Sequence, residues 1–226
     1  MRCAILSAVV KVRRRRGPSA LGCAGSIGSL WSVIAGAVMF GRSVSRPASG
    51  GVAVNQWTQL MLTRRVAGVA RGAYHYADVR QSPEAQAAFY AAMVLGINGP
   101  GDLPPVLDLE DSKGLPAAQV IDWTHRYLNT VQALTGRQPI IYTYPNFWRT
   151  QMANTTEFSH YPLWIADYNG QSAPGPLPGG WSNWTFWQYT STGRIPGIVG
   201  NTDINVYSGA QGDFGRYSNS VGLGSS

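Results

Sequence analysis

Short apolar segments alternate with amphipathic segments from about Gly72 onward, and this order most constrains what the chain can fold into. Helices are predicted after Ser82 and after Gly114, each between two apolar runs. Strands that alternate with helices favour a parallel sheet with helices on its outside, so we predict an α/β barrel-like fold. The runs typical of strands are 73–77, 103–110, 139–143, 162–166, 184–189 and 202–207.

Each predicted helix has its own start or stop signal. Ser82 is a good N-cap, Pro83 suits the first helical position and Glu84 adds an early acid. Gly136 is a typical stop for the second helix. Helical spacing predicts one buried stripe on each helix, formed by Ala85, Phe89 and Met93 on the first and by Val120, Trp123, Tyr127, Val131 and Leu134 on the second.

The run Asp108-Leu109-Glu110 ends an apolar segment and carries the clearest chemical signal. Residues two apart in a strand share a face, roughly 6.6 Å apart, so both carboxyl groups leave one face and Leu107 and Leu109 leave the other. Like charges held close together raise the pKa of one carboxyl, as a general acid for a glycosidic oxygen requires. The alternative is an ordinary strand end followed by a solvated loop.

Charge is distributed unevenly along the 226 residues, whose net charge is +7. Residues 1–77 contain no Asp or Glu, and they include a basic block at 13–16 and both cysteines. We interpret 1–50 as a basic, Gly/Ser-rich arm, 51–217 as the main domain and 218–226 as a flexible tail. Two interpretations of the arm are open: it is an export signal or membrane anchor, or it is a segment that is not native to the protein. No motif supports nucleic-acid binding by the arm.

Six motifs occur in the order expected for one family. GAYHYA, LPPVLDLE, TGRQPIIYT, YPLWIADY, WTFWQYTSTG and GNTDINVY together resemble glycoside hydrolase family 25, the Chalaropsis-type lysozymes. The resemblance is clear from about residue 71. It implies a flattened TIM-like β/α barrel that hydrolyses the β-1,4 bond between N-acetylmuramic acid and N-acetylglucosamine in peptidoglycan.

The resemblance also implies functional roles for individual residues. Glu110 matches the general acid. Asp108 matches its partner, which orients the substrate's N-acetyl group or acts as nucleophile, and Asp203 matches a further active-site acid. Positions that line the sugar groove are matched by Tyr74, Tyr142, Trp164, Trp187, Gln188 and Tyr189. No cofactor and no metal are expected, since the three histidines lack close ligand spacing.

One departure from the family concerns the first strand, which normally carries an active-site Asp. No acidic residue precedes Asp78, so we expect a barrel that is incomplete or irregular at its N-terminal strands. A non-catalytic peptidoglycan-binding relative is therefore the alternative function. We expect a monomer that acts on glycan strands, either secreted or cell-wall associated, or released as a phage lysin. Membrane contact is expected only if the arm is an anchor.

Overall fold

The computed structural model describes six segments of the chain, namely residues 8–12, 37–41, 70–95, 98–99, 102–194 and 200–209. Most of the predicted arm, its basic block and the whole predicted tail lie outside these segments, so the division at residue 50 stays a prediction. No helix in the described segments is long and apolar enough to cross a membrane.

In the described part of the chain, eight strands form one sheet in the order β1-β8-β7-β6-β5-β4-β3-β2. Neighbours run parallel except β7 and β8, which are antiparallel. The strands are β1 (Ala8–Val12), β2 (Ala37–Gly41), β3 (Ala70–Tyr76), β4 (Val106–Asp108), β5 (Ile140–Thr143), β6 (Leu163–Ala166), β7 (Phe186–Gly193) and β8 (Thr202–Tyr207).

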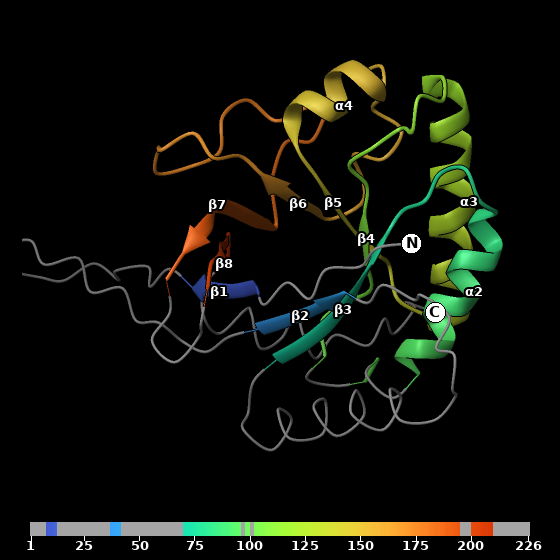
Figure 1. Cartoon of the computed structure of the whole chain (residues 1–226), viewed down its shortest axis with the longest axis horizontal. Helices are drawn as coiled ribbons and strands as arrows, with labels where there is room; N and C mark the ends of the chain where they lie inside the picture. Colours follow the sequence, from blue (N-terminus) through green and yellow to red (C-terminus); the bar gives the residue numbers. More distant parts are fainter. Residues whose placement is uncertain are drawn as a thin grey trace, which may run out of the picture.

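The two end strands of this order, β1 and β2, contact each other, so the sheet curls toward closure (Figure 1). Their backbones do not pair within the described residues, and the reversal at β8 breaks the parallel pattern. The predicted barrel-like α/β fold, incomplete and irregular at its N-terminal strands, is therefore confirmed. Neither β1 nor β2 was predicted from the sequence, and both lie in the basic, Gly/Ser-rich arm.

The helices of the described residues are α2 (Pro83–Val94), α3 (Ala117–Thr135) and α4 (Pro145–Gln151). Helices α2 and α3 pack side by side next to the sheet, and α4 lies apart from them, after β5 (Figure 1). The predicted start of α2 is confirmed, since the Ser82 hydroxyl accepts a hydrogen bond from the Ala85 amide at 3.2 Å. Gly136 ends α3 in the left-handed conformation with φ 68°, and its amide donates to the Gln132 carbonyl.

The buried stripe predicted for α2 is wrong. Phe89 is 45% exposed, and the face that packs inward instead presents Ala87, Tyr90, Ala91 and Val94. The alanines allow α2 to pack closely, and the Tyr90 hydroxyl donates to the Ala73 carbonyl at 2.7 Å, which ties the helix to β3. On α3 the predicted stripe is buried from Val120 to Val131, whereas Leu134 in the last turn is 56% exposed.

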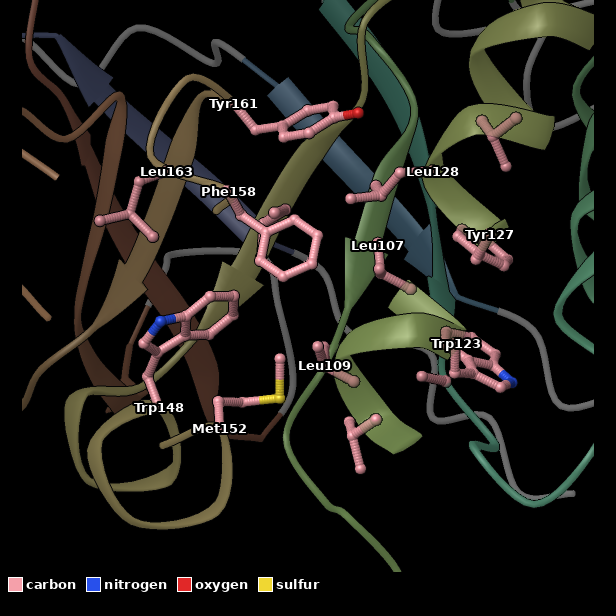
Figure 2. Close-up of a cluster of buried hydrophobic side chains, with 14 of the residues drawn as sticks. Leu107, Leu109, Trp123, Tyr127, Leu128, Trp148, Met152, Phe158, Tyr161 and Leu163 are labelled. Carbon is pink, nitrogen blue, oxygen red and sulfur yellow. The ribbon is translucent and has the colours of Figure 1, made fainter. Parts of the chain in front are cut away.

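Two apolar clusters lie on the two faces of the curled sheet. The outer cluster fills the space between the strands and the helices, where Leu107 and Leu109 contact the layer that includes Trp123 and Tyr127 (Figure 2). The inner cluster consists of Leu103, Val106, Ile140, Trp164, Phe186 and Tyr207. Because Leu107 and Leu109 face outward and Val106 faces inward, strand alternation directs Asp108 into the barrel.

Candidate active site

The candidate site forms at the rim of the barrel where the parallel strands end. Backbone pairing aligns Asp108 of β4 with Tyr142 of β5, and Gln188 of β7 with Asn205 of β8. Since β8 runs opposite to β2 through β7, its beginning lies at the same rim as the ends of those strands. Asp203, near the start of β8, is thereby brought to the carboxyl groups that follow β4.

Asp108 and Glu110 lie on one face, as the spacing of the two residues predicted. Asp108 is buried at 6% exposure, while Glu110 is partly exposed and lines a pocket. The two carboxyl groups share a hydrogen bond. The Oδ1 atom of Asp108 is buried and has no hydrogen-bond partner among the described residues. A buried carboxyl with an unsatisfied oxygen is costly, which is a feature more typical of a functional site than of a strand end.

Burial raises the pKa of both carboxyls above that of a solvated acid. For Asp108, the negative charges of Glu110 and Asp203 add to this effect. For Glu110, the hydrogen bond from Asp108 opposes it. The predicted shift is therefore present, but loss of water is its main cause, and repulsion between like charges comes second. The pair retains a proton to higher pH than an isolated carboxyl does.

Asp203 is the third member of the acidic cluster. Burial raises its pKa to about 6, and the charge of Glu110 adds to the shift. A hydrogen bond from Gln188 lowers the pKa of Asp203 and so favours the carboxylate. At neutral pH the site therefore combines an ionised Asp203 with an Asp108–Glu110 pair that binds protons more tightly than ordinary carboxyls.

Gln188 lies at the centre of a hydrogen-bond network around these acids. It is 4% exposed, its Oε1 accepts from the Tyr142 hydroxyl at 2.7 Å, and its Nε2 donates to the Tyr168 hydroxyl at 2.8 Å. The amide also bonds to Asp203. Both ends of the amide are thus used, which fixes its orientation and the positions of its partners.

A pocket of about 370 Å³ opens beside Glu110. Its walls come from the ends of β5 and β6, from the residues that follow them and from α4. The lining residues are Glu110, Tyr142, Tyr144, Pro145, Asn146, Arg149, Ala166, Asp167 and Tyr168. A larger groove of about 540 Å³ between the start of α2 and α3 contains none of the three acids at the rim, so we take the smaller pocket as the candidate site.

The aromatic residues predicted for the sugar groove are not all brought to this pocket. Tyr142 lines it, whereas Tyr74 and Trp164 belong to the inner cluster. The Trp164 Nε1 atom donates to Asn205 at 2.8 Å. Trp187 and Tyr189 lie on the opposite face of β7 from Gln188, in the outer layer. Since consecutive strand residues alternate between faces, Trp187, Gln188 and Tyr189 do not share one groove.

Several pocket residues were missed by the sequence analysis. Tyr144, Asn146, Arg149 and Tyr168 all follow directly on strands or lie in the short helix α4. The position after a strand end was the signal that could have identified them, because those positions meet at the rim of a barrel. Asp167, the residue directly after β6, also lines the pocket.

An α/β barrel with acids at its rim beside an aromatic-lined pocket is an architecture that many enzyme families share. The profile of the glycosyl hydrolases family 25 matches residues 44–198. Lysozyme M1 from Streptomyces globisporus is 36% identical over 158 residues, which cover 64% of this chain and 51% of that protein. N,O-diacetylmuramidase from Chalaropsis is 35% identical over 149 residues, which cover 62% of this chain and 64% of that protein.

Solved structures give the same result. A lysozyme from Streptomyces coelicolor matches with a TM-score of 0.64 at 30% identity, over 74% of this chain and 80% of that chain. A family GH25 lysozyme from Aspergillus fumigatus matches with a TM-score of 0.61 at 26% identity, over 74% and 81%. The chain belongs to family 25 of the glycosyl hydrolases. It spans about half the length of Lysozyme M1.

The family's first-strand Asp has no counterpart in this chain. Strand β1 has the sequence AVVKV, and it lies beside β8 with Ala8 aligned to Asp203. The first acidic residue of the whole chain is Asp78. The acids at the rim are therefore supplied by the end of β4, by the residues after β4 and β6, and by β8.

Proposed function

We propose that the chain is a glycosidase of the lysozyme type, which hydrolyses the β-1,4 bond between N-acetylmuramic acid and N-acetylglucosamine in peptidoglycan. The observation that carries the proposal is the acidic cluster, in which Glu110 is reached from the pocket while Asp108 and Asp203 lie behind it. Paired carboxyls with different environments are what glycoside hydrolysis requires. The names of relatives, lysozyme and N,O-diacetylmuramidase, support the same reaction.

In this proposal Glu110 is the general acid. Its raised pKa keeps a larger fraction of the carboxyl protonated near neutral pH, so it donates that proton to the glycosidic oxygen as the bond breaks. Because Glu110 is the partly exposed member of the pair, the proton shared with Asp108 reaches the substrate through Glu110. The leaving sugar is thereby released as a neutral alcohol.

The other two acids have different roles in this proposal. The ionised Asp203 stabilises an oxocarbenium-like transition state through its negative charge. Asp108 is too deeply buried to meet the sugar as freely as Glu110 does, which favours an orienting role toward Glu110 and the substrate's N-acetyl group over direct attack. We further propose that the protein acts outside the cytoplasm, on the cell wall, as a monomer.

The test is clearance of a suspension of purified peptidoglycan by the wild type and by Glu110→Gln. The matched control is Asp111→Asn, because Asp111 is the neighbouring acid but pairs with Lys113 at 2.6 Å and does not line the pocket. We expect the wild type and Asp111→Asn to clear the suspension and Glu110→Gln to fail. If all three are inert yet sediment with cell walls, the enzymatic proposal is lost and a binding function replaces it.

A further inference from the structure

Among the described residues that line the pocket beside Glu110, Arg149 is the single cationic one. It lies in the last turn of α4, whereas the two acids of the pocket, Glu110 and Asp167, come from the segments after β4 and β6. The pocket therefore has one positive position in a wall that is otherwise neutral or acidic.

The charge of Arg149 is not neutralised by a carboxylate. Its Nη2 donates to the backbone carbonyl of Pro176, and Arg149 makes no ion pair with any described residue. The Oδ2 atom of Asp167 already accepts from the Gly175 amide at 2.8 Å and from Asn169 at 3.0 Å. Glu110 shares its hydrogen bond with Asp108. A cation is thus kept unpaired although two acids line the same pocket.

The helix that carries Arg149 is firmly anchored. The two preceding residues that anchor α4, Phe147 and Trp148, are fully buried, and the Trp148 Nε1 atom donates to the Thr155 carbonyl at 3.0 Å. The bond to Pro176 uses only part of the guanidinium, which has five N–H donors in a planar fork. The remaining donors suit a carboxylate, which such a fork can bind through two parallel hydrogen bonds.

We propose that Arg149 binds a carboxylate on the 3-O-lactyl arm of the muramyl sugar and so makes the enzyme prefer anionic glycan strands. This inference rests on the proposed function. The carboxylate is the lactyl group itself in strands without peptide, or one of the peptide's own carboxylates where a stem is attached. Both sources present the same chemistry, and among the lining residues Arg149 alone offers a charge of the opposite sign.

The test measures binding in the Glu110→Gln background, so that it does not depend on turnover. Two pairs of probes are compared: peptide-free glycan with free lactyl carboxylates against its methyl ester, and peptide-bearing glycan before and after amidation of its free carboxylates. We expect the charged member of at least one pair to bind about fivefold to tenfold more tightly than the neutral member. The pair that shows the preference identifies the source of the carboxylate.

Variants at position 149 then decide the assignment. Arg149→Gln should bind both members of a pair equally, while Arg149→Lys should keep part of the preference because it keeps the charge. The matched control is Arg80→Gln, since Arg80 is also exposed and donates to a backbone carbonyl, that of Lys113, but lies outside the pocket. The inference is overturned if Arg149→Gln retains the preference, or if neither pair shows one before mutation. Glycan cleavage by the chain with Glu110 intact would still uphold the proposed function in that case.

Discussion

The side-chain amide of Gln188 donates a hydrogen bond to the Tyr168 hydroxyl at 2.8 Å, which links strand β7 to the segment after β6. The carbonyl end of the same amide accepts from Tyr142. One buried side chain therefore positions two residues of the pocket wall and also bonds to Asp203. The predictions below begin from this network.

Replacing Gln188 with Met should change the pH dependence as well as the rate. The Gln188 hydrogen bond lowers the pKa of Asp203, so its loss raises that pKa above its present value of about 6. Because Asp203 must be ionised, the acidic limb of the kcat/KM profile should move to higher pH, with an activity loss of about tenfold or more at neutral pH. An acidic limb that does not move would show that Gln188 does not act through Asp203.

The alkaline limb should report on Glu110. This residue must be protonated to act as a general acid, so activity should fall as pH rises through its raised pKa. Glu110→Gln should lower kcat by about 10²- to 10⁴-fold and remove this limb. Rates of glycan cleavage from acidic to alkaline pH provide the measurement, and a flat wild-type profile would contradict the assigned role.

Tyr168 is 54% exposed and lines the pocket, so its ring and its hydroxyl can be tested separately. Its hydroxyl accepts from Gln188 and also bonds to Ser191 and Tyr142, and we expect it to donate its proton to a bound substrate. Tyr168→Phe should raise KM by about threefold to tenfold, and Tyr168→Ala should raise it further. Phe89→Ala is the control, since Phe89 is a similarly exposed aromatic residue outside the pocket. Equal KM values for Tyr168→Phe and the wild type would argue against a donated proton.

Asp203→Asn should lower the activity and raise the free energy of unfolding at neutral pH. A buried acid whose pKa is raised on folding contributes stability below its unfolded pKa, and that contribution is lost as pH rises through the folded value of about 6. Relative to the wild type, Asp203→Asn should therefore gain stability between about pH 4 and about pH 8, by about 3 kcal/mol or less. Urea unfolding at the two pH values measures the difference. A constant difference would mean that the pKa of Asp203 is not raised by folding.

The loop that carries Pro176 should tolerate a methyl group at one glycine and not at another. Gly179 has φ +58°, and a Cβ there would collide with the Trp148 indole and approach Trp181 to 2.8 Å. Gly170 has φ +68° with nothing within 4 Å. Gly179→Ala should cost about 2–4 kcal/mol of unfolding free energy, and Gly170→Ala about 1–2 kcal/mol, from backbone strain alone. Thermal or urea unfolding of both variants compares them, and equal costs would exclude the collision.

The acid pair could be predicted from the sequence because alternation along a strand determines its geometry. Asp108 and Glu110 have to share a face whatever surrounds them, and Leu107 and Leu109 have to take the other. The face of α2 could not be predicted in the same way. Apolar residues occur on all sides of that helix, so the sequence does not show which side is buried. Whether the side with Phe89 or the side with the small Ala87 packs inward depends on how closely α3 approaches.

The pocket wall was harder to predict for a related reason. Both faces of β7 carry aromatic residues, so the sequence does not say whether Phe186 or Trp187 points into the barrel. Arg149 and Tyr168 follow strand ends, but their directions depend on the tertiary packing of α4 and of the loop after β6. Periodicity carries no information about such packing.

The reversed strand β8 has a consequence for the cell that makes this protein. Asp203 joins Asp108 and Glu110 only when β8 has paired with β7, and β8 comes last in chain order among the described strands. A nascent chain that already exposes Asp108 and Glu110 therefore still lacks the third acid. If peptidoglycan is the substrate, its cleavage therefore begins only after β8 has been synthesised and has paired with β7.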